Sequence, residues 1–200
     1  MAKENKKELM KAVRDEVLGL EASPLYSYRV ENHYFPVIGE GSHDAPIMFI
    51  GEAPGQNEAK TARPFCGASG KILDELLAGI GLARESVYIT NIVKDRPPEN
   101  RDPSPAEIMV YSPFLDRQID IIRPKVIATL GRFSMKYILE KYGAIESAEP
   151  ISNLHGKTIR ALAPHGEVLV LPLYHPAATI YNQSLKETLK KDFQVLKKFA

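Results

Sequence analysis

The feature that most constrains the fold is a set of four short, continuously apolar segments that alternate with helix-like segments. Strands that are apolar on both faces belong in a parallel sheet covered by helices on each side. The pattern therefore predicts an α/β fold, a three-layer α/β/α arrangement around a central four-stranded parallel sheet. The expected strands are 45–51 (APIMFIG), 86–91 (SVYITN), 125–131 (KVIATLG) and 168–173 (VLVLPL).

Helices are expected between these strands and at both ends of the chain. Leu9, Val13 and Val17 recur every four residues, which is the spacing of one helix face. The sequence SPAE at Ser104 is a capping box with proline at the first helical position, so a helix should begin there. The segment Val93–Pro103 holds three prolines and three basic residues and is expected to be a stiff, exposed loop. Further helices are expected over 67–81 and 132–143, and in a basic C-terminal segment with Leu185, Leu189, Phe193 and Leu196.

Length and composition bound the class of protein. Two hundred residues suit a single domain, 1–200, and 44% hydrophobic with 26% charged residues is typical of a water-soluble chain. No apolar run approaches the roughly 18 residues of a membrane span, and the N-terminus is too charged for a signal peptide. We therefore expect a cytoplasmic protein without a membrane partner. The single cysteine, Cys66, excludes an internal disulfide and an all-cysteine metal site, so no metal is expected.

Polar side chains follow three of the four expected strands. Glu52 follows the first, Asn91 ends the second, and His175 follows the fourth. Ligands of open parallel sheets bind beyond the carboxyl ends of the strands, so these three groups should share one site. Each residue alone has an ordinary explanation, as a solvated turn carboxylate, a turn cap or a structural imidazole. Their joint placement predicts a functional site without naming its substrate.

Three motifs resemble those of the uracil-DNA glycosylases, specifically the family 4 type. They are GEAPGQNEAKTARPFCGASGKILDELL from Gly51, VYITNIVKDRPPENRDP from Val87 and LPLYHPAA from Leu171. The resemblance runs in order from about Pro24 to Phe193. It implies the same central sheet, and an enzyme that hydrolyses the bond between uracil and deoxyribose after the nucleotide is flipped out of DNA.

The resemblance implies roles for the residues at the strand ends. Glu52 would position or activate the water and stabilise the cationic sugar, and His175 would donate a hydrogen bond to uracil O2. Asn91 would read the base edge by donating to O4 and accepting from N3–H. Phe65 would stack on uracil, and Glu58 would crowd out the methyl group of thymine. The base site would also include Gly51, Ala53 and Gln56.

DNA contacts are expected from three places in the sequence. The first is GASG, where Gly67, Ser69 and Gly70 open a helix whose N–H groups can bind phosphate. The second is the basic loop, and the third is the turn after His175, which the superfamily presses into the minor groove. The expected contacts from these last two regions and one further lysine are Lys94, Arg96, Arg101, Lys157, Pro176 and Ala177.

The chain departs from family 4 at the four cysteines that hold a [4Fe–4S] cluster. The corresponding positions are Leu20, Ser23, Asp95 and Tyr111, and a cluster needs about four thiolates. We therefore expect no cofactor, with Tyr111 filling apolar volume and Asp95 paired to a basic residue. The chain also lacks the basic insertion of a relative that links covalently to DNA, and no lysine stands at a nucleophile position.

The leading hypothesis is a monofunctional uracil-DNA glycosylase of base excision repair. It would act as a monomer on double- or single-stranded DNA containing uracil, in the cytoplasm and at the nucleoid during repair. One alternative is a glycosylase for hypoxanthine or xanthine, against which the amide of Asn91 argues. Another is an inactive DNA-binding relative. A small-nucleotide-binding protein has little support, because the G-x-G-x-x-G and Walker A patterns are missing.

Overall fold

The centre of the protein is a mixed sheet whose strand order is β1-β3-β2-β4-β6-β5 in the computed structural model, which describes residues 3–144 and 149–199. The predicted four-stranded parallel sheet is confirmed as β3-β2-β4-β6. An antiparallel strand extends each edge. The strands are β1 (Glu40–Gly41), β2 (Ile47–Gly51), β3 (Tyr88–Asn91), β4 (Val126–Leu130), β5 (Ile159–Ala163) and β6 (Gly166–Leu173).

The two edge strands differ from the sequence prediction for physical reasons. β1 is only two residues long, which is too short to leave a pattern. β5 alternates buried and exposed residues because one of its faces meets solvent, so it lacks the continuous apolar run of a central strand. It forms a hairpin with β6, and Gly166 has a φ of 119°, a conformation that favours glycine.

The long helices begin and end close to their predicted limits. At the start of α5, Ser104 Oγ accepts from the N–H of Glu107 at 3.2 Å, and the Glu107 carboxylate accepts from the N–H of Ser104 at 2.8 Å, so the capping box is confirmed. The longer helices are α1 (Lys3–Leu18), α4 (Ala68–Gly79), α5 (Pro105–Ile122), α6 (Arg132–Lys141) and α9 (Gln183–Phe193). Shorter ones, which the sequence pattern does not reveal, are α2 (Tyr26–Glu31), α3 (Gln56–Thr61), α7 (Ile151–Leu154) and α8 (Ala178–Tyr181). 3₁₀ turns cover Arg84–Ser86, Pro98–Asn100 and Gln194–Phe199.

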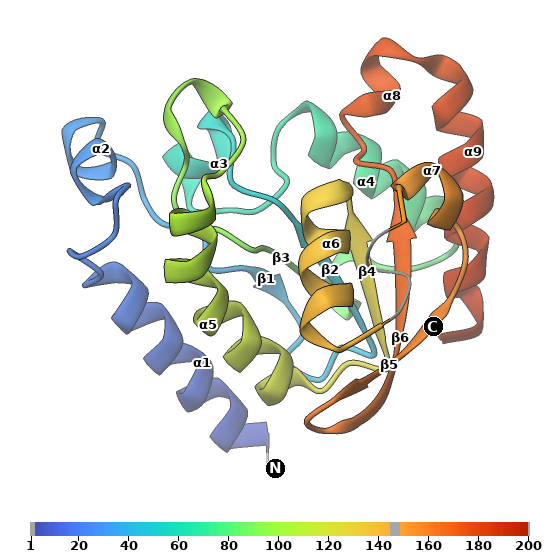
Figure 1. Ribbon diagram of the computed structural model, residues 1–200, viewed down its shortest axis with the longest axis horizontal. Helices are drawn as coiled ribbons and strands as arrows, with labels where there is room; N and C mark the ends of the chain where they lie inside the picture. Colours follow the sequence, from blue (N-terminus) through green and yellow to red (C-terminus); the bar gives the residue numbers. More distant parts are fainter. Residues whose placement is uncertain (1–2, 145–148, 200) are drawn as a thin grey trace.

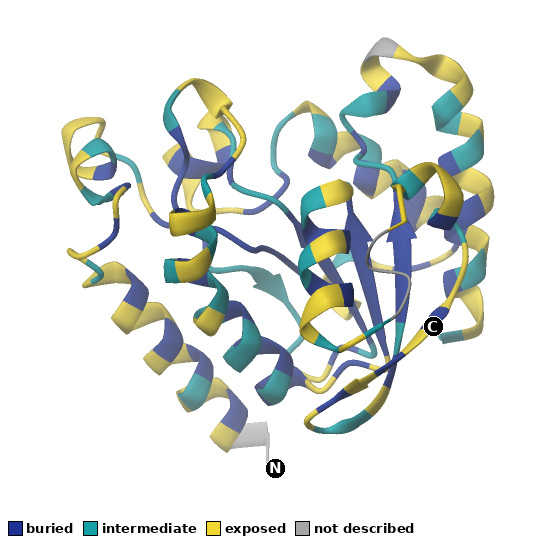
Figure 2. Ribbon diagram, viewed as in Figure 1, coloured by how far each residue is buried: buried dark blue, intermediate teal, exposed yellow. Residues whose placement is uncertain are grey.

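The parallel strands of the sheet are buried on both faces, as Figure 2 shows by their dark colour. Alternate residues of β2 point to opposite faces, so Met48 and Ile50 join one core cluster while Ile47 and Phe49 join another. The first cluster packs under α1, α5 and α6, and the second under α4, α9 and the final 3₁₀ turn. Figure 1 shows α1 and α5 on one side of the sheet and α9 on the other, which is the predicted three-layer arrangement.

The chain reverses direction across the sheet next to β2. β3 follows β2 in sequence and lies on one side of it, whereas β4 lies on the other side. Such a reversal leaves a crevice at the carboxyl ends of the strands, where ligands of α/β proteins bind. Glu52 directly follows β2 at this point. In the described part of the chain, no helix is both long and apolar enough to cross a membrane.

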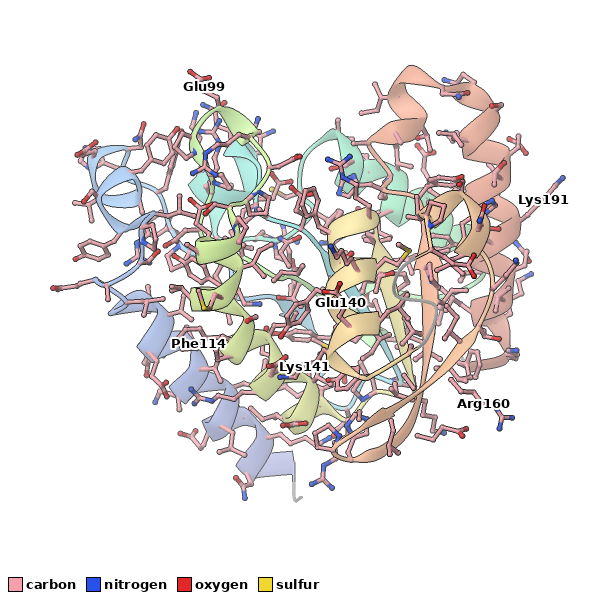
Figure 3. All side chains as sticks on the ribbon, viewed as in Figure 1. Glu99, Phe114, Glu140, Lys141, Arg160 and Lys191 are labelled. Atoms are coloured by element: carbon pink, nitrogen blue, oxygen red, sulfur yellow. The ribbon has the colours of Figure 1, made fainter. Side chains whose placement is uncertain are left out.

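The C-terminal helix depends on one aromatic contact with the sheet. The rings of Phe193 and Phe49 stack at 5.7 Å, and both side chains are fully buried. We expect Phe193→Ala to lower the free energy of unfolding by about 3–5 kcal/mol, because it leaves a cavity in the core. Lys191→Ala, on the exposed side of α9 (Figure 3), should change it by less than about 0.5 kcal/mol. Urea unfolding measures both, and equal midpoints for the two variants would contradict this packing.

Candidate active site

A cavity of about 370 Å³ opens at the carboxyl edge of the central strands. Loops after β2, β3 and β6 and the start of α4 form its wall. Many residues predicted from the sequence meet there, namely Glu52, Ala53, Glu58, Phe65, Ser69, Asn91, His175 and Ala177. Gly55, Asn100 and Asp102 also line it and were not predicted. Asn100 follows Glu99, and both have a positive φ, so a tight turn that the sequence pattern does not reveal brings Asn100 to the rim.

The inner end of the cavity is built on Gly51, the last residue of β2. A Cβ at this position would collide with Asn91 Oδ1 and with the ring of Phe65. Glycine is therefore required for the amide and the aromatic ring to approach each other. Asn91 is only 2% exposed, yet its side-chain amide forms no hydrogen bond within the described residues. The amide is not among the described polar groups that are buried without a partner, so it keeps access to the cavity that it lines and is suited to bind a ligand there.

Phe65 is held in a strained backbone conformation. Its φ is 47°, which is rare for a bulky residue, and its ring is 5% exposed. The Glu58 carboxylate holds the following turn, because one of its oxygens accepts from the N–H groups of Cys66 at 3.1 Å and Gly67 at 3.0 Å. Local strain of this kind is typical of binding sites. Glu58 therefore fixes the aromatic wall, in addition to lining the cavity itself.

The protonation of His175 follows from its surroundings. Burial lowers the pKa of His175 to about 4, so the imidazole is neutral at pH 7. The N–H of Ala177 donates to Nδ1 at 3.2 Å, which makes Nδ1 an acceptor. The proton of the neutral ring must then reside on Nε2. The ring lies 5.7 Å from that of Phe65, so the site offers a neutral N–H donor beside an aromatic wall.

The Glu52 carboxyl is poised to change charge near neutral pH. Burial and, to a smaller extent, the negative charge of Asp102 raise its pKa to about 7, against the opposing effect of the positive Arg132. Asp102 and Arg132 form an ion pair of 2.8 Å at the rim. The backbone of Glu52 is fixed by the N–H of Val93, which donates to its carbonyl at 3.0 Å. A group with such a pKa can take a proton from water at physiological pH.

The prediction of an exposed basic loop is wrong for residues 93–96, which are buried. Lys94 is 0% exposed and bonds only to protein oxygens, so it does not face a phosphate. Arg96 is 9% exposed and donates to the hydroxyls of Tyr28 and Tyr34 and to Asn100 Oδ1. It therefore holds the rim of the cavity.

Other predicted contact residues lie outside the cavity lining. Arg101 forms a two-pronged ion pair with Glu107, at 2.9 and 2.6 Å, and is partly exposed. The exposed side chain of Gln56 is directed to the Tyr34 hydroxyl at 3.5 Å. Pro176 is buried beneath its turn, whereas Lys157 is exposed.

Gly67 and Gly70 at the start of α4 serve the packing of the Phe65 turn. The N–H of Gly67 is taken by Glu58, and Gly70 lies against the carbonyl of Phe65, where a Cβ would collide. Ser69, which lies between them, lines the cavity. The backbone of this turn is therefore fixed from within the protein.

The four positions that correspond to the cluster cysteines of family 4 lie close together in the fold. Ser23 Oγ and Tyr111 Oη are 2.6 Å apart, and Tyr111 donates to Asp95 Oδ2 at 2.5 Å. Arg29 pairs with the same carboxylate at 3.1 Å, which confirms the expected basic partner of Asp95. Leu20 packs against the same small core as Tyr111.

This group of residues does not fit an iron–sulfur cluster. None of the four supplies a thiolate, and their polar atoms already satisfy one another. In the described part of the chain, no group of three or more His, Cys, Asp or Glu residues could hold a metal ion.

Comparison with known proteins decides the family. The model of the uracil DNA glycosylase superfamily matches residues 38–197, which is most of the chain. This chain belongs to that superfamily. It is 46% identical to the type-4 uracil-DNA glycosylase of Sulfurisphaera tokodaii over 192 residues, 96% of this chain and 84% of the relative. The type-4 enzyme of Thermotoga maritima is 38% identical over 97% of this chain and 96% of its own length.

A more distant relative is the type-5 uracil-DNA glycosylase of Thermus thermophilus, which is 32% identical over 70% of this chain and 68% of its own length. The chain is therefore family 4-like, as the sequence motifs indicate. The roles of individual residues stay predictions.

The charges around Glu52 generate a test that needs no substrate. We expect the Glu52 side-chain carboxyl to titrate with a pKa of about 7, which ¹³C NMR of labelled glutamate measures. Asp102→Asn removes a neighbouring negative charge, favours the carboxylate and should lower this pKa. Arg132→Ala removes a positive charge and should raise it. The control is Asp74→Asn on α4, where the Asp74 carboxylate pairs with Arg84. Equal shifts in all three variants would refute the electrostatic assignment.

Proposed function

We propose that this protein is a uracil-DNA glycosylase that hydrolyses the bond between uracil N1 and deoxyribose C1′ and leaves an abasic site for base excision repair. One observation carries the proposal. One cavity is lined by the amide of Asn91, which has no hydrogen bond within the described residues, by the neutral imidazole donor of His175 and by the strained Phe65. The Glu52 carboxyl, which titrates near neutral pH, lines the same cavity. Membership of the superfamily and the named type-4 relatives support it.

The cavity explains how uracil would be chosen. The Asn91 amide can donate to O4 and accept from N3–H of uracil, whereas cytosine presents the reverse pattern. A site that binds such an edge rejects the wrong partner strongly, because buried polar groups would then be left unpaired. The ring of Phe65 offers a stacking surface. Glu58, whose free oxygen lies near Gly55, narrows the site on the side where thymine would carry its methyl group.

The chemistry requires charge stabilisation on both sides of the breaking bond. The electron pair of the N1–C1′ bond leaves with uracil, so negative charge spreads to O2 and O4 while the sugar becomes cationic. The Nε2–H of His175 donates to O2, and the ionised carboxylate of Glu52 faces the sugar. Water then adds its hydroxyl to C1′, and its proton passes to Glu52. Since Glu52 acts in its charged form, the rate should rise with pH through about 7.

DNA would approach across the open rim of the cavity. Ser69 and Ala177 line this rim, and the exposed Lys157 and the partly exposed Arg101 are available to phosphates nearby. We propose action as a monomer on double- or single-stranded DNA, with cytoplasmic location. Lys94 and Arg96 take no part in phosphate binding in this proposal, because they are buried.

We further propose that the enzyme works without an iron–sulfur cluster. The hydrogen-bonded group of Ser23, Asp95, Tyr111 and Arg29 ties α2 and α5 to the segment after β3. Arg29 also donates to the carbonyls of Val17 and Leu18, at 3.1 and 2.8 Å. These contacts join the same chain segments that a cluster bound at these positions would join.

The function is tested by base release from oligonucleotides containing uracil, hypoxanthine, xanthine or mismatched thymine, followed by alkaline cleavage of abasic sites. We expect release of uracil alone. Glu52→Gln and His175→Ala should each lower the single-turnover rate constant by roughly 100-fold or more, because each removes a group aimed at developing charge. Glu75→Gln, an exposed carboxyl paired with Lys186, is the matched control and should be fully active.

The other outcomes are informative in different ways. Release of hypoxanthine or xanthine in preference to uracil would show that the substrate is a purine and that Asn91 does not select the base. DNA binding without release of any base would show an inactive relative. Either result would overturn the proposed activity.

The absence of a cluster has its own test. Metal analysis of active protein should find no stoichiometric iron, and a chelator should leave the rate unchanged. Tyr111→Phe leaves Asp95 and Ser23 short of a partner in the interior and should cost about 1–3 kcal/mol of unfolding free energy. Tyr137→Phe, which removes a hydrogen bond to Asp116 nearer the surface, is the control and should cost less. Iron that is needed for activity would contradict the proposal.

A further inference from the structure

Lys94 is a buried lysine for which the reaction described above has no use. The residue is 0% exposed, and it is not among the residues that line the cavity. Nζ contacts three oxygens, at 2.8 Å from Thr90 Oγ1, 2.7 Å from the carbonyl oxygen of Asn91 and 2.6 Å from Gln118 Oε1. Two of these partners lie on β3, and one of them, Asn91, is the residue whose side chain lines the cavity.

All three partner oxygens are acceptors. The carbonyl oxygen of Asn91 can only accept, and the protons of Thr90 and Gln118 are donated elsewhere. The hydroxyl of Thr90 donates to the carbonyl of Ile38 at 2.7 Å. The amide nitrogen of Gln118 donates to the same carbonyl at 2.9 Å and to the Tyr88 hydroxyl at 3.1 Å, so its oxygen must face Lys94. Three acceptors match the three donors of an ammonium, whereas a neutral amine would turn a lone pair toward one of them.

The charge of this group has no carboxylate partner among the described contacts. Burial lowers the pKa of Lys94, and the three hydrogen bonds to the charged form oppose that effect. Of the neighbouring titratable groups, burial raises the pKa of Tyr88, which stays neutral. The carboxylate of Asp95 is taken by Arg29 and Tyr111. The three acceptors favour the ammonium over the neutral amine, and a positive charge in such a low-dielectric interior is weakly screened.

We propose that Lys94 is a positioning residue for the glycosylase reaction: its ammonium fixes the strand end that carries the Asn91 amide and adds positive potential behind the base as uracil departs as an anion. The inference rests on the proposed function. A positive charge from Lys94 would complement His175, which is neutral at pH 7 and supplies a hydrogen bond without a charge. A fixed charge aimed at a developing anion needs no reorganisation during the reaction.

The test compares two leaving groups in the same DNA. Single-stranded oligonucleotides containing deoxyuridine or 5-fluorodeoxyuridine are cleaved by wild type and by Lys94→Met in single-turnover experiments. The fluorinated base forms a more stable anion and depends less on outside stabilisation. We expect the variant to lose roughly tenfold or more with uracil, less than the roughly 100-fold typical of a donor that touches the anion. The loss with 5-fluorouracil should be clearly smaller, and the dissociation constant for DNA should be little changed.

The control is Phe193→Ala, which weakens the core on the side of the sheet opposite α5. Both variants are assayed at temperatures where circular dichroism shows them folded. A purely structural effect lowers both rates by the same factor, so an equal loss on the two bases in Lys94→Met would overturn the electrostatic part of the proposal. Wild-type activity in the same assay separates this result from failure of the proposed function.

A second measurement covers the case in which Lys94→Met does not fold. In wild-type protein labelled with ¹³C at lysine Cε, the resonance of Lys94 is identified through its contact with Thr90 and followed with pH. A charged ammonium at pH 7 is expected. A neutral amine at pH 7 would overturn the electrostatic part of the proposal, because no positive charge would then stand behind the base.

Discussion

The structure depends on the burial of one short segment, residues 93–96, directly after β3. Its consecutive polar side chains reach three different parts of the protein. Lys94 binds the carbonyl of Asn91, Asp95 binds Arg29 and Tyr111, and Arg96 binds Asn100 at the cavity rim. Buried polar groups are costly unless every one is satisfied, so this segment has one well-defined conformation. The segment thereby fixes the inner end of the cavity at Asn91, the contacts with α2 and α5, and the cavity rim at Asn100 in one arrangement.

The same segment shows how a family 4-like chain can do without cluster ligands. A cluster joins chain segments by four strong bonds at one point, whereas here one buried ion pair and hydrogen bonds to hydroxyls join them. A buried ion pair is weak evidence of stability by itself, because desolvation offsets attraction. Its value here is geometric, since Asp95 has partners on both α2 and α5 that restrict where the segment can lie. The cavity electrostatics follow from burial as well, with a neutral His175 and a Glu52 that ionises near pH 7.

Sequence reasoning recovers what periodicity and capping control. Continuous apolar runs identify the four parallel strands, and the capping box at Ser104 identifies the start of α5. The same reasoning places Glu52, Asn91 and His175 at one edge, because parallel strands end together. It fails for Lys94 and Arg96, since basic residues among prolines resemble a solvated loop and their burial depends on distant partners such as Gln118 and Tyr28. It also misses Asn100 and Asp102, which a turn with positive φ brings to the cavity.

In the proposed reaction, Asn91, His175 and Phe65 form one slot for a flipped uracil. The most direct measurement is a crystal structure of the Glu52→Gln variant with a uracil-containing oligonucleotide, in which slow cleavage preserves the substrate. We expect uracil to stack on Phe65, with the Asn91 amide bound to O4 and N3–H and His175 Nε2–H bound to O2. A uracil bound outside this cavity, or one whose edge faces away from Asn91, would contradict it.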